Sequence, residues 1–344
     1  MSLILSKNPD AIKVYELAKN LQKRFVHKLD NLSLEFGENK KFEEVIWLRE
    51  NGRFGGGNRF EVRDESLFNS ASVNVSQIHY ESDPSKSLES ATAISTIIHP
   101  KNPNVPSIHI HISLTILKDG NTYYRLMADL NPSIANTNDK EIFDFELKKV
   151  TKENYKEGSI QGDKYFFIPA LNRHRGISHF YLENYKTSNK ENDLEFAKEF
   201  GQTVIDTYIN IITNAFETRK TFTFEDTQEQ LAYHTLYLFQ VLTLDRGTTS
   251  GLLVHNQNDV GIMGSLPKIV NKKLLQKWID NLETPQNELL INIIDSIEDN
   301  GVINTQIKEK LAQVVRNHYK KHPHSLKYQA SGNTSPSTVD NHTK

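Results

Sequence analysis

Histidine and serine side chains alternate with apolar residues between positions 107 and 114. Ser107, His109, His111 and Ser113 share one face of this segment, and three isoleucines and a leucine form the other. This period of two predicts a β-strand with one apolar and one polar face. The polar face carries no lysine or glutamate, so we expect it to line a cavity; the alternative is an ordinary solvated face. Imidazoles change protonation state near neutral pH, and the pattern therefore favours proton transfer.

A second strand should bring a carboxylate to the same place. Asp119-Gly120 is a hairpin signal between two alternating runs. It predicts that residues 107–114 and 123–130 pair as antiparallel strands. Asp129 then lies near the end of the second strand, before a turn. We expect its carboxylate to reach the cavity of His109, and capping of the turn is the alternative role.

A metal site is another possibility. Prolines at positions 100, 103 and 106 separate the histidine strand from His99, and proline makes such a connection stiff. His99, His109 and His111 could together coordinate a divalent cation, because imidazole nitrogen is a common ligand of such ions. A metal-dependent enzyme is therefore one hypothesis for this chain.

A basic cluster lies further along the chain. Arg173, His174 and Arg175 stand between two aromatic-rich runs, 164–169 and 178–182, that we interpret as strands. Cationic side chains held between strands are typical of an anion site. Ion pairing with surface carboxylates is the alternative interpretation.

The remaining segments supply the elements that must position these residues. Apolar residues at helical spacing predict helices over 9–36, 138–156, 191–218, 225–234, 272–281, 288–299 and 305–318. We interpret 236–248 as a buried strand and a turn, and 252–266 as a strand or hairpin. The triple glycine at 55–57 predicts a hairpin or bulge, and it lacks the Gly-Lys-Ser/Thr of a phosphate-binding loop. We expect one domain over 1–328 and a disordered tail over 329–344, which is rich in Ser, Thr and Asn.

Composition limits the class of protein. Lysine and arginine number 41 and aspartate and glutamate 43, a net charge of −2, which gives no reason to expect nucleic acid as a partner. The chain has no cysteine, so disulfides, thiolate metal sites and a cysteine nucleophile are excluded. The apolar run at the N-terminus is too short for a signal peptide or a membrane span. We therefore expect a cytoplasmic globular protein.

Several segments resemble the oxygen-dependent coproporphyrinogen III oxidases. The segment from Ser95 to His109 is similar in full to that family's Ser-x-x-x-His-Pro-x-Asn-Pro-x-x-Pro-x-x-His motif. Other similar segments, in the family's order along the chain, are Gly55–Arg59, Val73–Ser76, Asp129–Pro132, Asp163–Phe166, Arg175–Ile177 and Asp245–Leu252.

The resemblance implies an α+β fold, with a broad antiparallel β-sheet flanked by helices on both faces, assembled as a homodimer. It implies oxidative decarboxylation of coproporphyrinogen III to protoporphyrinogen IX in haem biosynthesis, with molecular oxygen as co-substrate, no organic cofactor and a possible divalent metal. By the same resemblance, His109 matches a general acid/base position and Asp129 the carboxylate that holds the pyrrole N–H groups. Ser95 matches a substrate contact, and His99 a proposed metal ligand beside His109.

The sequence also departs from the family pattern. Where the family has Asn-x-Arg, this chain has His111-Ile112-Ser113, and the family's arginine binds a substrate carboxylate. A buried carboxylate without a cationic partner is costly. We therefore expect weaker binding of a tetracarboxylate substrate unless Arg125, Arg173 or Arg175 faces the site. His111, Ser113 and Arg175 are the substrate-binding candidates in addition to Ser95.

Further family residues are replaced as well. Leu126–Ala128 stands in place of a triple glycine, and Ser178-His179 in place of a double glycine. These departures support a second hypothesis, a diverged member that binds a tetrapyrrole or related ligand without this turnover. The first hypothesis remains an active oxidase whose propionate contacts lie at new positions.

Overall fold

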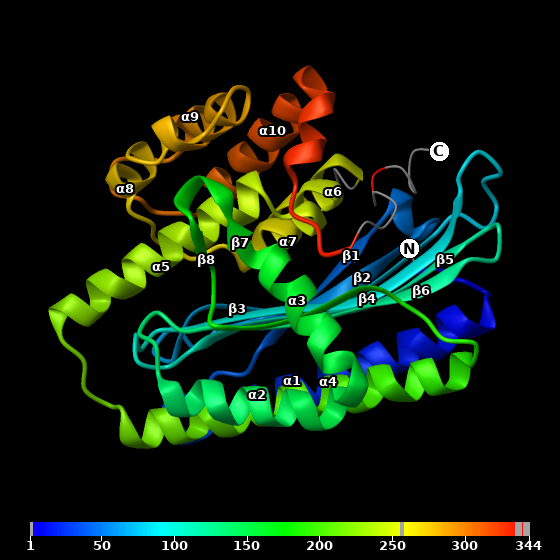
Figure 1. Cartoon of the computed structure of the whole chain (residues 1–344), viewed down its shortest axis with the longest axis horizontal. Helices are drawn as coiled ribbons and strands as arrows, with labels where there is room; N and C mark the ends of the chain where they lie inside the picture. The colour runs from blue at the N-terminus through cyan, green and yellow to red at the C-terminus, as the bar shows by residue number, and fades with distance from the viewer. Residues whose placement is uncertain (1–2, 255–257, 334–338, 340–344) are drawn as a thin grey trace.

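A seven-stranded antiparallel sheet forms the centre of the molecule in the computed structural model, which describes residues 3–254, 258–333 and 339. Figure 1 shows it edge-on between two groups of helices. This arrangement confirms the predicted α+β fold with helices on both faces. In spatial order the strands are β1 (Glu43–Leu48), β2 (Gly55–Glu61), β3 (Phe68–His79), β4 (Leu88–Pro100), β5 (Ser107–Leu117), β6 (Thr122–Asn131) and β9 (Ser178–Tyr185).

The lower face of the sheet in Figure 1 packs against three helices, α1 (Pro9–Phe36), α2 (Thr137–Thr151) and α4 (Lys190–Thr218). The apolar face of β5, which carries Ile108, Ile110 and Ile112, is buried in this cluster. Burial of this apolar surface is what holds the layer to the sheet. The asparagines at positions 8, 136 and 189 accept hydrogen bonds from the first turns of the three helices.

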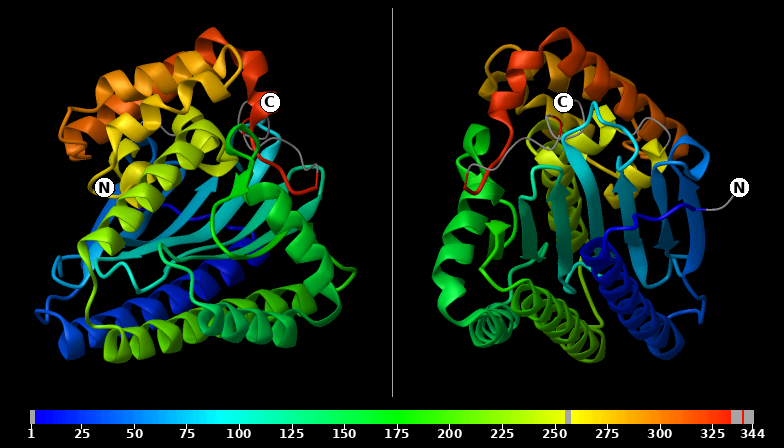
Figure 2. Two further views of the ribbon diagram at one scale, coloured as in Figure 1. Left: turned by 60° about the vertical axis from the view of Figure 1, so that its left-hand side comes forward. Right: turned by 90° about the vertical axis from the view of Figure 1, so that its right-hand side faces the viewer.

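The upper layer contains α5 (Phe224–Thr243), α6 (Arg246–Val254), α7 (Asp259–Ile262), α8 (Lys272–Gln276), α9 (Gln286–Ser296) and α10 (Thr305–Lys321). These helices bury a second apolar cluster among themselves, and Figure 2 shows them arching over the sheet. α3 (Tyr155–Phe166) packs against β9, and a small hairpin of β7 (Phe167–Ile168) and β8 (Arg173–His174) follows it. No helix among the described residues is long and apolar enough to cross a membrane.

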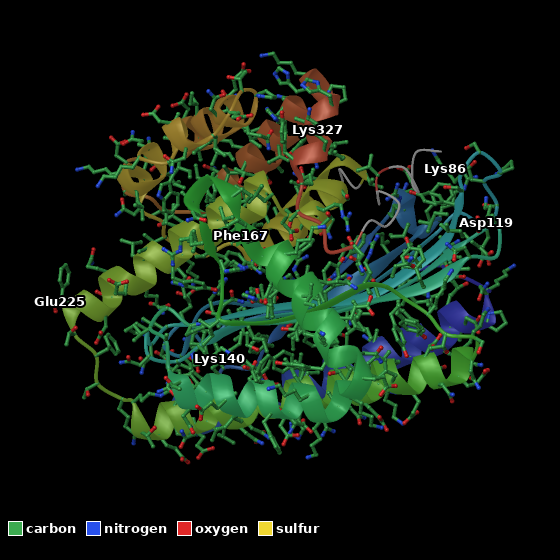
Figure 3. All side chains as sticks on the ribbon, viewed as in Figure 1. Lys86, Asp119, Lys140, Phe167, Glu225 and Lys327 are labelled. Atoms are coloured by element: carbon green, nitrogen blue, oxygen red, sulfur yellow. The ribbon has the colours of Figure 1, made fainter. Side chains whose placement is uncertain are left out.

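The predicted hairpin is confirmed. β5 pairs with β6 in antiparallel register, and His109 lies directly opposite Asp129. Leu117 N donates to Asn121 O at 2.9 Å across the turn, and Gly120 has φ 87°, a conformation that favours glycine. Figure 3 labels Asp119 at the tip of this hairpin, at one end of the sheet.

Two predicted strands are wrong, and the one predicted over 164–169 is a strand only at Phe167–Ile168, in β7. Lys164–Phe166 is the last turn of α3, residues 236–243 continue α5, and the described parts of 252–266 form α6, α7 and a 3₁₀ turn. Residues 233–243 of α5 are all buried. A helix buried on every side loses the 3.6-residue alternation that distinguishes it from a buried strand. Residues 255–257 lie outside the described part of the chain.

The predicted tail is described only at its start. Ala330 N donates to Leu244 O at 2.9 Å, and Gly332 O accepts from Lys164 Nζ at 2.8 Å. Positions 334–338 and 340–344 lie outside the described residues. The division into a domain over 1–328 and a disordered tail therefore stays a prediction.

Candidate functional site

A cavity of about 310 Å³ lies between the polar face of the sheet and the helices above it. Its volume is in the range of small-molecule sites. The polar face of β5 opens into it, as the alternation predicts. Strands β3 to β6 and β9 contribute the floor, and α3, α5, α6 and the α7 region contribute the walls. Polar and aromatic residues that line it include Trp47, Asn74, Ser95, His109, His111, Ser113, Arg125, Tyr165, Tyr181, Tyr237, Asp245, Arg246 and Asn258.

His111 is held by hydroxyl groups on both sides of its ring. Ser95, its cross-strand neighbour on β4, lies 2.6 Å from Nδ1, and Ser113 Oγ lies 3.0 Å from Nε2. Burial, followed by the nearby His109 and Arg125, lowers the pKa of His111 to about 3. The ring is therefore neutral and fixed in orientation at neutral pH. Three of the predicted site residues form one hydrogen-bonded unit.

His109 lies next to this unit and faces a buried cation. The Arg175 guanidinium approaches its Nδ1 at 3.4 Å. Burial is the main cause that lowers the pKa of His109 to about 4, and the charge of Arg175 adds to it. The imidazole is thus neutral at neutral pH, unlike the unperturbed histidine that the sequence suggested.

Asp129 and Arg175 form a fully buried ion pair behind His109. Arg175 Nη2 lies 2.5 Å from Asp129 Oδ2, and both side chains have no solvent exposure. Arg175 Nη1 also donates to Gln240 Oε1 at 2.6 Å, and the guanidinium stacks on the ring of Tyr237 at 4.8 Å. Neither charged residue lines the cavity, so the pair supports His109 from within the fold. Arg173, by contrast, is exposed on β8, so the predicted basic cluster is divided between surface and core.

His99 lies apart from the cavity. It is fully buried, its Nδ1 lies 3.0 Å from Ser107 Oγ, and its ring packs edge-on against Tyr237. Across the described ranges, no three His, Cys, Asp or Glu side chains are grouped as a metal site would require. His99, His109 and His111 therefore do not form the cluster that the metal hypothesis needs. A metal role for His99 and His109 stays a prediction.

Asp245 and Arg246 are site residues that the sequence reasoning did not select. Both line the cavity at the start of α6. Tyr165 Oη donates to Asp245 Oδ1 at 3.0 Å, and Arg246 forms an ion pair with the buried Glu183. The signal was present in the sequence, because the Asp245–Leu252 run was among the segments that resemble the family.

Comparison with known proteins agrees with this geometry. Residues 13–299 match the family described as coproporphyrinogen III oxidase. The chain belongs to the coproporphyrinogen III oxidase family. It is 28% identical over 297 residues to the oxygen-dependent coproporphyrinogen-III oxidase of Prochlorococcus marinus subsp. pastoris, an alignment that covers 75% of this chain and 84% of the relative.

Two further relatives match at similar distance. The mitochondrial oxygen-dependent coproporphyrinogen-III oxidase of Mus musculus is 26% identical over 274 residues, which cover 72% of this chain and 60% of the mouse protein. The oxygen-dependent enzyme of Rickettsia akari is 24% identical over 269 residues, or 73% of this chain and 94% of that protein. These identities make the chain a divergent member of the coproporphyrinogen oxidase family.

The triple glycine of this family member lies inside β2 and makes room for an aromatic wall of the cavity. A Cβ at Gly57 would lie 2.2 Å from Val75 O and 2.9 Å from Trp47 Nε1. The Trp47 indole therefore lies directly over Gly57, and its Nε1 donates to Asn74 Oδ1 at 3.2 Å. The predicted hairpin or bulge is thus a strand, whose glycines allow close approach of a cavity residue.

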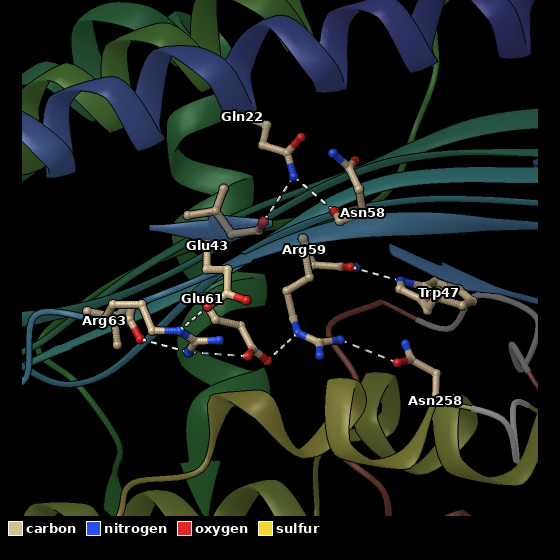
Figure 4. A network of polar contacts seen from close by, with 11 residues as sticks. Gln22, Glu43, Trp47, Asn58, Arg59, Glu61, Arg63 and Asn258 are labelled. Carbon is tan, nitrogen blue, oxygen red and sulfur yellow. Dashed lines mark hydrogen bonds and ion pairs between the residues drawn. The ribbon is translucent and has the colours of Figure 1, made fainter. Parts of the chain in front are cut away.

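Figure 4 shows the polar network beside Trp47. Arg59 Nε donates to Glu61 Oε1 at 2.6 Å, and Arg59 Nη1 donates to Asn258 Oδ1 at 3.3 Å. Asn258 lies at the start of α7 and also lines the cavity. The hydrogen bond between Arg59 and Asn258 therefore connects β2 to the start of α7 in the upper layer, beside the cavity.

Gly57→Ala is expected to displace Trp47 and to destabilise the fold by about 1–3 kcal/mol, as overpacking of a close-packed interior does. The chain has two tryptophans, so Trp47 fluorescence can be followed alone in a Trp278→Phe background. We expect a changed Trp47 emission spectrum. Gly251→Ala is the control, because Gly251 lines the same cavity as Trp47 and a Cβ at Gly251 would meet nothing closer than 3.5 Å. An unchanged spectrum in Gly57→Ala would contradict the proposed contact.

His179 next to the Asp129–Arg175 pair is a buried imidazolium. Its Nδ1 lies 2.8 Å from Asp163 Oδ1, and its Nε2 lies 2.7 Å from Arg175 O. Both acceptors require a ring proton, so both nitrogens are protonated. Nε2 is also 3.6 Å from Asp129 Oδ1, and the ring stacks on His174 at 5.4 Å. Burial alone would lower the pKa of His179, but the hydrogen bond to Asp163 and the charge of Asp129 outweigh it and raise the pKa above 6.5.

This raised pKa predicts a pH-dependent stability. The folded state binds the proton of His179 more tightly than the unfolded state, so the stabilisation is fully present below pH 6.5 and is lost as the pH rises through the folded pKa. We expect His179→Gln to reduce the free energy of unfolding more at pH 6 than at pH 9, measured by urea titration. Asp163→Asn should weaken the same pH dependence. Equal losses at the two pH values would contradict the charged state of His179.

Proposed function

We propose that this chain catalyses the oxygen-dependent oxidative decarboxylation of coproporphyrinogen III to protoporphyrinogen IX in haem biosynthesis. Membership of the family supports the reaction class. The single observation that carries it to this chain is the cavity, whose floor presents the matching histidine, His109, beside the buried Asp129–Arg175 pair. Assembly as a homodimer, a cytoplasmic location and the lack of an organic cofactor are part of the same proposal.

The reaction turns a propionate into a vinyl group. A hydride equivalent leaves the β-carbon and the carboxylate leaves as carbon dioxide; molecular oxygen accepts the two electrons, and one further proton completes hydrogen peroxide. We assign proton transfer to His109. The hydrogen of the β-carbon leaves as hydride, so this further proton comes from solvent. The imidazole of His109 can take it up and donate it to the hydroperoxide anion, which is general acid/base work.

The other predicted residues take supporting parts in this proposal. Ser95 and Ser113 fix the ring of His111, so the three act on the substrate as one polar surface. Asp129 balances the charge of Arg175, and the pair holds a fixed electrostatic environment around His109. Such preorganised charges stabilise a developing charge without reorganisation during the reaction.

A second candidate function is binding of a tetrapyrrole without turnover. The observation that favours it is Ser113, which stands where the family has a carboxylate-binding arginine. Incubation of the purified protein with coproporphyrinogen III in air and under nitrogen separates the two functions. Vinyl-bearing porphyrinogen that forms only in air supports the oxidase. Binding of coproporphyrin III without product in air supports the binding protein, and absence of both contradicts the two proposals.

A further inference from the structure

We infer that Arg125 is the carboxylate-binding cation of this cavity, in place of the arginine that the family carries at position 113. The inference rests on the proposed substrate class, a porphyrinogen with propionate groups. The guanidinium that binds this carboxylate would then come from β6 in place of β5.

Strand register places Arg125 at the required point. Ser113 and Arg125 are direct cross-strand partners in the β5–β6 pair. Side chains of directly opposed residues point to the same face, with Cβ atoms about 4.5–5.5 Å apart. Both residues line the cavity. A guanidinium that starts from position 125 can therefore occupy the volume that an arginine at position 113 would fill.

Two other arginines near the cavity do not line it. Arg59 pairs with Glu61 at 2.6 Å, and Arg175 pairs with Asp129 at 2.5 Å behind His109. Arg246 lines the cavity from the start of α6, in an ion pair with the buried Glu183, and it does not lie opposite position 113.

The surroundings of Arg125 suit an anionic group. Arg125 is half-buried, so it keeps access to the cavity while part of its solvation is removed. Its guanidinium lies 5.6 Å from the ring centre of Tyr123, a contact that orients the planar group. The neighbouring His111 is neutral and hydrogen-bonded to Ser113, so no imidazolium competes for the substrate carboxylate. Charge-assisted bonds from arginine to carboxylate are among the strongest polar contacts in proteins.

A contact between Arg125 and a substrate carboxylate affects binding of a charged porphyrin and leaves binding of an uncharged one unchanged, which a purely structural role of Arg125 would not do. We expect Arg125→Gln to weaken binding of coproporphyrin III, measured by fluorescence titration, by about 10- to 100-fold, the loss of one charge-assisted bond. Binding of the uncharged tetramethyl ester of coproporphyrin should not change. Arg173→Gln is the matched control, because Arg173 is exposed and does not line the cavity.

The decisive variant moves the guanidinium from position 125 on β6 to position 113 on β5. We expect Ser113→Arg added to Arg125→Gln to recover at least half of the lost binding free energy. Ser113→Arg alone should tighten binding by less than it does in the Arg125→Gln background, because the position opposite is already cationic. Thermal unfolding of each variant shows whether it is folded.

Porphyrin binding by the wild type and by Arg125→Gln distinguishes a wrong role for Arg125 from a wrong substrate class. A wild type that binds coproporphyrin III, with Arg125→Gln binding equally well, overturns the role of Arg125 and leaves the oxidase proposal standing. If Arg125→Gln weakens binding of coproporphyrin III and of its tetramethyl ester equally, the role of Arg125 is overturned too. The loss would then come from a changed shape of the cavity and not from a lost charge. A wild type that binds neither compound overturns the substrate class together with the inference.

Discussion

His109→Ala is expected to lower aerobic turnover of coproporphyrinogen III by about 10²–10⁴-fold, the usual effect of losing a positioned acid/base group. Binding of coproporphyrin III should change by no more than about threefold, because His109 contributes one neutral ring to a much larger lining. The contact of His109 with Arg175 is long, at 3.4 Å, so its loss should cost little stability. Steady-state rates in air and fluorescence titration measure the two effects.

The matched control is His27→Ala, which removes an exposed histidine on α1 and should leave turnover unchanged. His111→Ala is informative as well, since it removes a histidine two residues away that two serines already hold. Turnover in His109→Ala equal to that of the wild type would falsify the assigned role. A wild type that binds the porphyrin and gives no product in air would favour the binding function.

Asp129→Ala is expected to reduce the free energy of unfolding by about 3–5 kcal/mol, which is the typical cost of breaking a buried ion pair on one side. Arg175 would stay in an interior without solvent exposure, and the nearby imidazolium of His179 would lose the carboxylate 3.6 Å away. Urea unfolding at neutral pH measures the loss. We expect turnover to fall as well, because Arg175 helps to position His109.

A double variant tests whether the loss of stability comes from the unpaired charge of Arg175. In Asp129→Leu/Arg175→Met both charges are replaced by apolar side chains, and such exchanges of a whole buried pair are often neutral. We therefore expect the double variant to unfold at higher urea concentration than Asp129→Ala, while its turnover stays low. A loss below about 1 kcal/mol in Asp129→Ala would show that Arg175 finds another partner or reaches solvent.

The sequence alone determined the elements whose patterns are local. Alternation over 107–114 gave a correct strand with the correct face toward the cavity, because side chains of a strand point to opposite sides in turn. Asp119-Gly120 set the register that puts His109 opposite Asp129. The helices that begin at Pro9 and Lys190 each have one polar face, so their period was visible. The similar segments, which lie in the family's order, indicated the family.

The tertiary structure alone decided what depends on residues distant in the chain. Asp129 meets Arg175 across 46 positions, and Asp245 meets Tyr165 across 80; no local pattern indicates either contact. Burial and the charge of Arg175 lower the pKa of His109, whereas the hydrogen bond to Asp163 and the charge of Asp129 raise the pKa of His179. The α5 segment was mistaken for a strand because packing surrounds it on every side. Periodicity records which face of a segment is buried, and it says nothing of the partners that bury it or of their charge.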